Sequence, residues 1–317
     1  MNSECGNLSY VSSKPDEDLL IAGIAQNGLW ASSDGGDSWH AMGTGKGSAK
    51  ITNRTNYISY DPADPKRFWE VGIYNPGGVY STVDSGKTFQ AVGDIFHNDF
   101  VSIDFSDPDR KTLLASGHET RQKLLWSTDQ GETWTDIGPD TPEEATVCSY
   151  PFVVDANTFL LGCGVTLSGD GKSGIYKSTD AGASWDSVSP DQGGASAPLV
   201  ASDGSMYWAT QFGGGMVRST DQGDTWEQFV PGGVIGNYTP SELPDGRIAV
   251  LSDRKILLTS DEGKTWQVVT TDLPFVATGF FYSPFRRAFY AWHFTCDDKV
   301  PDDGLLRYDF DYEEPAP

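Results

Sequence analysis

Hydrophobic and polar residues alternate along most of the chain in short runs, which turn-forming residues separate. The clearest stretch covers residues 101–137, where strand-like runs follow one another at 101–105, 112–116, 123–127 and 134–137. Alternation with a period of two, bounded by Gly, Pro, Asp and Ser, is typical of β-strands. The stretch therefore predicts four short antiparallel strands, A to D, that form one sheet.

A second pattern, Ser/Thr-x-Asp-x-Gly-x-Ser/Thr-aromatic, recurs six times, each copy at the turn between a predicted third and fourth strand. Its aspartate can accept hydrogen bonds from backbone N–H groups of its own turn, and its glycine can take a positive φ. The final aromatic residue anchors the next strand in apolar packing. We expect the six aspartates to be structural: Asp34, Asp84, Asp129, Asp180, Asp221 and Asp261.

The six aspartates are 40 to 51 residues apart, and a repeat of that length with strand-like flanks is typical of β-propeller blades. Three further strand-like runs without the motif follow the sixth copy, at 277–283, 288–294 and 305–310. We therefore predict an all-β chain that forms a single seven-bladed β-propeller over residues 1–317, with the last blade incomplete or completed by the N-terminus. The blades are expected to start near residues 8, 57, 101, 147, 197, 239 and 277.

The six motif copies resemble the Asp-box, or BNR repeat, and almost the whole chain is similar to the Asp-box β-propeller superfamily. That superfamily includes sialidases, xyloglucan-active hydrolases, sortilin-type receptors and photosystem-assembly factors. The resemblance implies that the boxes lie on the face opposite an active site. It does not identify a member family. The Phe/Tyr-Arg-Ile-Pro motif of sialidases is missing before the first box, and xyloglucan-active relatives use two tandem propellers where this chain has length for one.

Charge and hydropathy narrow the range of partners. The chain has 22 Lys and Arg residues against 45 Asp and Glu residues, a formal net charge of −23. Such a field repels phosphate groups, so we expect no nucleic-acid partner, and an arginine-rich patch of the assembly-factor type conflicts with it. No apolar run approaches the ~18 residues of a membrane span, so we expect no membrane insertion.

The four cysteines predict two disulfides. If the hairpin between them turns about residues 155–156, Cys148 and Cys163 are opposite neighbours on strands A and B of the fourth blade. Cys5 and Cys296 lie where the ring closes, and a bond there would tie the two chain ends together; four free thiols are the alternative. Because disulfides form in oxidising compartments, we expect a secreted or periplasmic protein whose signal peptide is absent from this sequence. The cysteines and histidines lack zinc-site spacing, so we expect no metal and no other cofactor.

Candidate chemistry concentrates on the face opposite the boxes, where the loops are longer and more varied. The connection into the third blade and that blade's B–C loop carry titratable residues, and the second blade adds neighbours to them. The predicted catalytic residues are His97, Asp99, His118 and Glu119, and the predicted substrate-binding residues are Arg54, Tyr74, Asn75 and Arg121. The alternative is that the histidines are hydrogen-bonded rim residues and the arginines form structural ion pairs.

These residue types fit two ways of cleaving a glycosidic bond. Asp99 and Glu119 are the candidate acid and base of a hydrolase. A histidine base, an arginine that neutralises a uronate carboxylate and Tyr74 as the proton donor fit a lyase that works by β-elimination. We therefore predict a secreted, monomeric, carbohydrate-active enzyme, a glycosidase or a polysaccharide lyase. The competing hypothesis is a non-catalytic propeller that binds a glycan or a protein.

Overall fold

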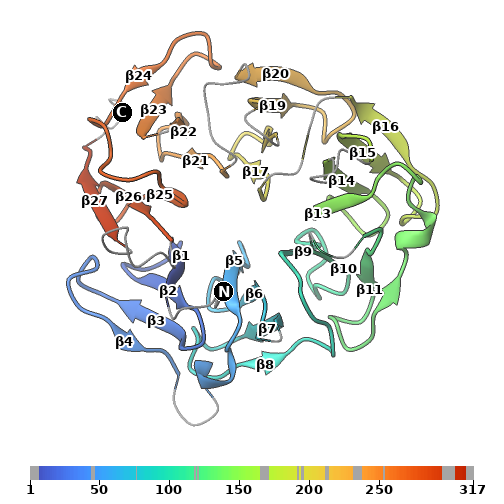
Figure 1. Cartoon of the computed structure of the whole chain (residues 1–317), viewed down its shortest axis with the longest axis horizontal. Helices are drawn as coiled ribbons and strands as arrows, with labels where there is room; N and C mark the ends of the chain where they lie inside the picture. Colours follow the sequence, from blue (N-terminus) through green and yellow to red (C-terminus); the bar gives the residue numbers. More distant parts are fainter. Residues whose placement is uncertain are drawn as a thin grey trace.

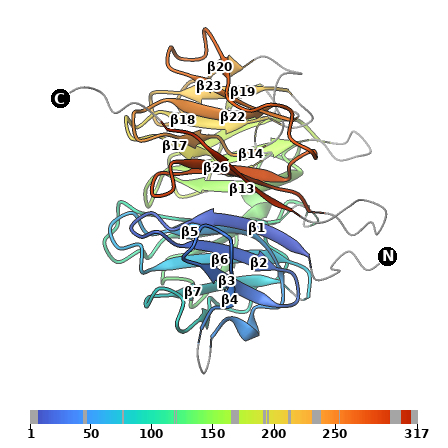
Figure 2. The same cartoon turned by 90° about the vertical axis from the view of Figure 1, so that its left-hand side faces the viewer.

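In the computed structural model, the chain forms seven small antiparallel sheets that are arranged as the blades of a ring (Figure 1). Figure 2 views the same ring edge-on. The predicted seven-bladed, all-β propeller is confirmed. The structure describes residues 7–43, 47–75, 77–117, 119, 121–164, 171–190, 193, 196–210, 214–230, 238–252, 254–294 and 304–311.

Blades one to three have four strands each, ordered along the chain from the centre of the ring outward. Blade one consists of β1 (Leu8–Ser13), β2 (Leu20–Ile24), β3 (Gly28–Ser32) and β4 (His40–Ala41). Blade two consists of β5 (Arg54–Tyr60), β6 (Phe68–Ile73), β7 (Gly78–Thr82) and β8 (Gln90–Ala91). Blade three consists of β9 (Phe100–Ile103), β10 (Leu113–Ser116), β11 (Leu125–Ser127) and β12 (Thr135–Asp136).

Blades four to six repeat this order, and blade seven has three strands among the described residues. Blade four consists of β13 (Val147–Val153), β14 (Phe159–Gly164), β15 (Gly174–Ser178) and β16 (Asp186–Ser189). Blade five consists of β17 (Leu199–Val200), β18 (Met206–Ala209), β19 (Met216–Ser219) and β20 (Glu227–Val230). Blade six consists of β21 (Ser241–Glu242), β22 (Ile248–Ser252), β23 (Lys255–Thr259) and β24 (Gln267–Val268). Blade seven consists of β25 (Gly279–Ser283), β26 (Ala288–Trp292) and β27 (Leu305–Asp309).

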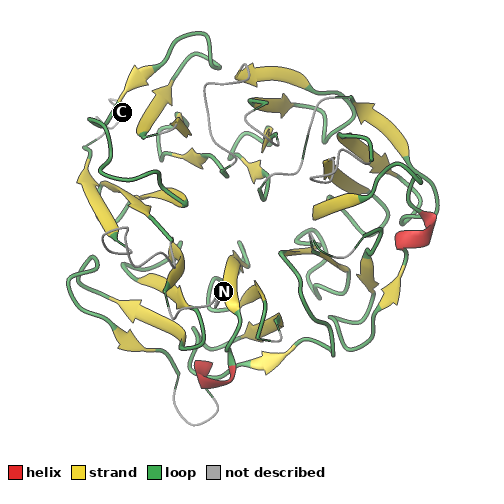
Figure 3. Cartoon of the chain, viewed as in Figure 1, coloured by secondary structure: helices red, strands yellow, loops and turns green. Residues whose placement is uncertain are grey.

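Helical structure in the described part of the chain is limited to two short 3₁₀ turns, η1 (Ser48–Lys50) and η2 (Gly138–Asp140) (Figure 3). Both lie at the outer edge of the ring, where one blade connects to the next. The described part of the chain therefore has no helical layer, and the sheets cover one another.

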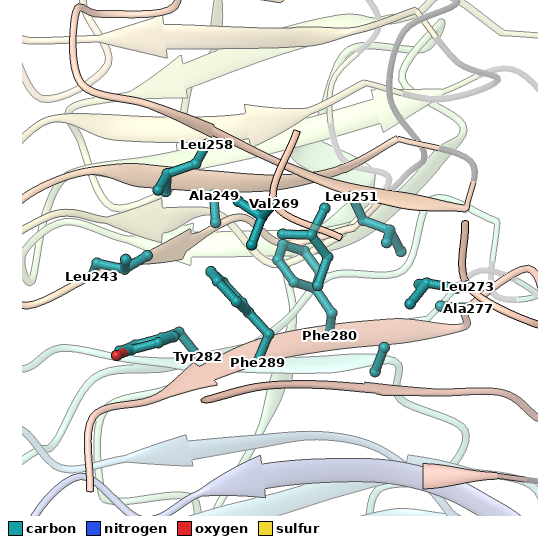
Figure 4. Close-up of a cluster of buried hydrophobic side chains, with 12 residues drawn as sticks. Leu243, Ala249, Leu251, Leu258, Val269, Leu273, Ala277, Phe280, Tyr282 and Phe289 are labelled. Atoms are coloured by element: carbon teal, nitrogen blue, oxygen red, sulfur yellow. The ribbon is translucent and has the colours of Figure 1, made fainter. Parts of the chain in front are cut away.

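The hydrophobic core lies between neighbouring blades. Figure 4 shows the cluster between blades six and seven, where Leu251 and Leu258 of one sheet pack near Phe280 and Phe289 of the next. Side chains alternate along a strand, so each inner sheet buries one face against the preceding blade and the other against the following blade. The outermost strands β4, β8, β12 and β24 are two residues long, and both residues of each are exposed.

The ring closes between blades seven and one. The Trp292 indole donates to the Ser9 carbonyl (3.3 Å) and packs edge-on against Tyr10, with ring centroids 5.6 Å apart. The Arg286 guanidinium binds the Asp18 carboxylate at 2.7 Å. Strand β1 pairs with β2 of blade one, so among the described residues the last blade is incomplete, as one of the two predicted forms has it. The predicted Cys5–Cys296 disulfide lies outside the described residues.

The Cys148–Cys163 disulfide is present, with a Cα–Cα distance of 4.1 Å. The predicted register needs a correction near the hairpin, because Val153 pairs with Phe159, one residue out of the expected alignment. An irregularity between Val147 and Tyr150 then shifts the register back, so Val147 pairs with Gly164 as expected. Since a shift of one residue moves side chains to the other face of a strand, this irregularity brings the two cysteines opposite each other.

The six repeated turns share one hydrogen-bond pattern. In the third copy, Asp129 Oδ1 accepts hydrogen bonds from the Ser127 hydroxyl (2.8 Å) and the Thr133 N–H (2.9 Å), and Oδ2 accepts one from the Thr133 hydroxyl. The Ser127 hydroxyl accepts one in turn from the Gly131 N–H (2.8 Å). These hydrogen bonds lower the pKa of the Asp129 carboxyl. The sequence pattern assigned positive φ to the glycine alone, yet in five copies the residue before it also has a positive φ: Ser85, Gln130, Ala181, Gln222 and Glu262.

Candidate functional site

Three segments meet on the face opposite the repeated turns: the β6–β7 loop, the β8–β9 connection and the β10–β11 loop. They approach so closely that a Cβ on Gly117 would lie 2.1 Å from the His97 carbonyl oxygen, and one on Gly77 would lie 3.0 Å from the His97 nitrogen. Tyr74, Asn75 and His97 all have positive φ, between 56° and 60°. Non-glycine residues rarely adopt this conformation, and such residues concentrate where the surrounding structure fixes a functional side chain.

The Glu119 carboxylate joins two of these segments. The Tyr74 hydroxyl donates to Glu119 Oε1 at 3.2 Å, and Glu119 Oε2 lies 3.3 Å from His97 Nε2. The Tyr74 and His97 rings meet edge to face with centroids 5.1 Å apart. A tyrosine, a histidine and a carboxylate predicted from separate segments of blades two and three are thus brought into direct contact.

Arg54, at the start of β5, completes the arrangement. Its guanidinium lies over the Tyr74 ring at 4.9 Å and over the Phe294 ring at 5.2 Å. Among the described residues it forms no ion pair, and it is only half-buried. Its positive charge is therefore held in place by aromatic rings, and no described carboxylate neutralises it at short range. We name Arg54, Tyr74, His97 and Glu119 the rim cluster.

The electrostatics of the rim cluster favour a protonated tyrosine. Burial raises the pKa of the Tyr74 hydroxyl, the nearby Glu119 carboxylate raises it further, and Arg54 partly opposes both. Tyr74 is therefore a hydrogen-bond donor at neutral pH. The Asp99 carboxylate also contributes to raising this pKa, which places it near the cluster.

The other predicted residues differ in how they relate to the cluster. Asp99 is buried, its carbonyl accepts a hydrogen bond from the Asn56 amide (2.7 Å), and its carboxylate adds to the rise that burial causes in the pKa of Tyr150. Asn75 is exposed, and its carbonyl accepts a hydrogen bond from the Thr52 hydroxyl. Arg121 is exposed. The predicted residue His118 lies outside the described residues.

A cavity of about 740 Å³ occupies the centre of the ring. Its wall carries hydroxyl groups and seven aromatic residues, which are Tyr10, Tyr57, Tyr150, Tyr238, Phe280, Phe281 and Trp292. Asn56 links this wall to Asp99, because its amide donates to the Asp99 carbonyl and lies 3.4 Å from the Tyr150 hydroxyl. Aromatic faces with nearby hydroxyls suit a polar ligand that has apolar faces, as sugar rings do.

Sequence reasoning missed Asn56, Tyr150 and Phe294. Asn56 and Tyr150 lie on inner strands, where alternation along the strand could have indicated that they face the channel. Phe294 follows β26 in the last blade, and it reaches Arg54 across the seam between the end and the beginning of the ring. No local pattern in the sequence signals that contact.

The described residues contain no group of three His, Cys, Asp or Glu side chains arranged to hold a metal ion. Nor do they include a helix with the length and apolar character needed to cross a membrane.

Comparison with known proteins supports the fold. No family model matches the chain. It is 24% identical over 265 residues to a xyloglucanase from a Paenibacillus species, a match that covers 73% of this chain and 26% of the relative. Its structure resembles the GH74 xyloglucanase from Xanthomonas campestris (TM-score 0.65, 17% identity, 97% of this chain and 55% of that one). It also resembles YCF48 bound to a D1 peptide (TM-score 0.61, 15% identity, 98% of this chain and 95% of that one).

These likenesses define the class of the protein as a seven-bladed β-propeller similar to the blades of GH74 xyloglucanases and to YCF48. The chain spans about a quarter of the curated xyloglucanase and about half of the xyloglucanase structure. At these identities the comparisons show a shared fold, and folds of this kind host many activities.

Proposed function

We propose that the protein is a secreted or periplasmic carbohydrate-active enzyme that cleaves glycosidic bonds, with the rim cluster as its active site. One observation carries the proposal: the Arg54 guanidinium, which has no ion-pair partner among the described residues, lies 4.9 Å over the ring of a tyrosine that shares a carboxylate with His97. An unneutralised cation beside a proton donor and an imidazole matches the needs of elimination at a uronic acid.

In this mechanism, His97 takes the proton from the carbon next to the uronate carboxylate, and Arg54 binds that carboxylate and stabilises the charge that develops on it. The Tyr74 hydroxyl gives its proton to the leaving glycosidic oxygen. The carbon–oxygen bond breaks, a carbon–carbon double bond forms in the sugar ring, and no water is consumed. Glu119 is 57% exposed, so its hydrogen bond from Tyr74 and its contact with His97 can exchange for substrate contacts at small cost.

Hydrolysis by Asp99 and Glu119 is the other scheme that the residues allow. The rim cluster favours elimination because it brings an arginine, a tyrosine and a histidine together around one carboxylate, whereas hydrolysis needs two carboxylates that face each other across the bond. The likeness to xyloglucanases favours the hydrolytic scheme, so the chemical nature of the product has to distinguish elimination from hydrolysis.

A panel of neutral and uronate-containing polysaccharides, assayed both for new reducing ends and for the ultraviolet absorbance of an unsaturated uronate, tests the proposal. Elimination gives both signals, and hydrolysis gives reducing ends alone. The variant Tyr74→Phe should lose the activity. Tyr80→Phe is the matched control on β7 of the same blade, because the Tyr80 hydroxyl donates to the Lys50 carbonyl and not to a residue of the rim cluster. Absence of both signals on every substrate would refute the enzymatic function.

A second candidate, a binding propeller without catalysis, has one specific observation in its favour. YCF48, whose structure is bound to a D1 peptide, matches this chain over 95% of its own length, so a single ring of this size can bind a partner. The aromatic wall of the central cavity offers such a surface. Binding of a glycan or peptide library without turnover would support this candidate, and we expect the protein to be a monomer in either case, which size-exclusion chromatography with light scattering checks.

A further inference from the structure

Glu70 is a fully buried carboxyl group on β6 that the proposed mechanism does not use. It lies on the face of blade two that packs against blade one, where it pairs across the sheet with Ile58 and Tyr80. Burial raises the pKa of Glu70 to about 8, and the Thr55 and Asn53 side chains oppose that rise. A buried carboxyl group has a high free-energy cost once it ionises, so its presence needs a reason.

The Glu70 carboxyl lies beside the two residues on either side of Arg54. The Asn53 amide donates to Glu70 Oε2 at 3.2 Å, and the Thr55 side chain lies near enough to the Glu70 carboxyl to lower its pKa. Because side chains alternate along a strand, Asn53 and Thr55 point toward blade one while Arg54 points the other way, toward Tyr74. Glu70 therefore contacts the residues before and after Arg54 on the side of the strand opposite the Arg54 side chain.

The surrounding residues leave room for these contacts and for little else. A Cβ on Gly72 would lie 2.6 Å from the Asn53 side chain and 2.5 Å from the Arg54 carbonyl, and one on Gly23 of blade one would lie 2.4 Å from the Thr55 Cβ. Glycine at both positions lets Asn53 and Thr55 pack beside Glu70. The start of β5 is thus fixed by packing from two blades.

Two buried oxygens in this group have no hydrogen-bond partner among the described residues: Glu70 Oε1 and Asn53 Oδ1. Two oxygens of this kind need a donor, and a proton on the Glu70 carboxyl is the donor that the site itself can supply. Tyr80 on β7 is the titratable residue that pairs with Glu70 across the sheet, and it is in electrostatic contact with it. It is neutral near neutral pH, since burial and Glu70 both raise its pKa.

We propose that Glu70 is a positioning residue for Arg54: through its hydrogen bond with Asn53 and its packing beside Thr55, its neutral carboxyl keeps the guanidinium between the Tyr74 and Phe294 rings. Ionisation of Glu70 would turn this support into a buried charge that the site cannot satisfy, and the start of β5 would move to relieve it. The functional meaning of the placement rests on the proposed function, in which Arg54 binds the substrate carboxylate.

Nuclear magnetic resonance of the Arg54 side chain tests the placement without any substrate. Protons on a side chain held against two aromatic rings are shifted upfield, and the Arg54 signals can be assigned by their loss in Arg54→Lys. We expect Glu70→Leu to lose most of that upfield shift. Glu70→Gln should retain it, because an amide has the shape and hydrogen bonds of the neutral acid and supplies the missing donor. Ile58→Ala creates a buried cavity on the same face of blade two. It is the control for general destabilisation and should leave the Arg54 signals in place.

A pH titration keeps the proposal testable if Glu70→Leu fails to fold. In the unaltered protein the Arg54 signals should move with a midpoint near the pKa of Glu70, about 8, and in Glu70→Gln they should not move. Arg54 signals that stay fixed while Glu70 titrates, or that keep their upfield shift in folded Glu70→Leu, would overturn the proposal. An inactive protein that shows the expected shifts would reject the enzymatic function and leave the positioning role standing.

Discussion

The six repeated turns and the rim cluster lie on opposite faces of one ring and are built in opposite ways. Each turn is closed by hydrogen bonds between residues two or four apart in the sequence, such as those of Asp129 with Ser127 and Thr133. The rim cluster joins residues 45 apart in the case of Tyr74 and Glu119, and it reaches Phe294 from the last blade. The turns recur because each is self-sufficient, whereas the cluster occurs once because it depends on the whole ring.

The carboxyl groups of the two regions show the same contrast. Hydrogen bonds from the turn lower the pKa of aspartates such as Asp129, and these groups stabilise the fold as exposed anions. Behind the rim cluster, burial raises the pKa of Glu70 to about 8, and that group belongs to the fold as a neutral acid. On one face, charged carboxylates close the local turns. Behind the other face, the carboxyl group that supports the rim cluster is neutral. Substitutions on the two faces should therefore have separable effects.

The largest expected effect is on catalysis. Tyr74→Phe removes the proposed proton donor and Glu119→Ala removes the carboxylate between Tyr74 and His97, so each should lower the rate by roughly 10²–10⁴-fold. The melting temperature should stay nearly unchanged, because the contact between these two side chains lies at the exposed rim. Steady-state kinetics on the substrate found by the polysaccharide panel, with thermal denaturation in parallel, checks both statements. Full activity in Tyr74→Phe would show that the rim cluster is not the active site.

The next effect concerns stability on the site face, where blade four relies on a covalent link. Replacing Cys148 and Cys163 together by serine opens a loop with a sequence separation of 15 and should lower the free energy of unfolding by about 3 kcal/mol. Chemical denaturation measures the loss. Glu143→Gln, an exposed change in the loop that precedes blade four, is the control and should have no measurable effect. Non-reducing peptide mapping of the same samples tests the predicted Cys5–Cys296 bond.

A smaller effect is expected at a repeated turn. Ser127→Ala removes the buried hydroxyl that donates to Asp129 and accepts from Gly131, so it should cost about 1–2 kcal/mol of unfolding free energy while leaving activity unchanged. Asp129→Asn should likewise lower the melting temperature before it affects activity. The matched control, Glu132→Ala, alters an exposed side chain of the same turn and should be neutral. A loss of activity in Ser127→Ala without a loss of stability would contradict the separation of the two faces.

The smallest expected effect is on the melting temperature at acidic pH. Partial burial raises the pKa of Asp221, but hydrogen bonds from Thr225 and Ser219 outweigh it and lower the pKa from 3.8 to about 2. A carboxyl group whose pKa is lowered by folding contributes stability above its unfolded pKa, and that contribution is lost as pH falls through the folded value. The melting temperature of the unaltered protein should therefore fall more steeply than that of Asp221→Asn between about pH 4 and pH 2. Parallel acid titrations of the two proteins would show no difference if the turn did not favour the charged form.

The sequence by itself determined the ring of seven blades, since alternation and a local motif repeat in every unit and each unit needs a neighbour to bury its faces. It also placed the loops that hold Tyr74, His97 and Glu119 side by side, because strand order assigns each loop to a face. The Cys148–Cys163 bond was predicted, although the register that produces it depends on an irregularity in β13 that no residue pattern signalled.

Only the tertiary structure decided how those loops meet and what supports them. The stacking of Arg54 between Tyr74 and Phe294 joins the second blade to the last one, and the burial of Glu70 behind Arg54 depends on the packing of blade one against blade two. A local hydrogen bond is fixed by spacing along the chain and can be read from it. A contact between distant blades, and the shift in pKa that burial causes, depend on where the closed ring brings each side chain, and residue spacing carries no record of that.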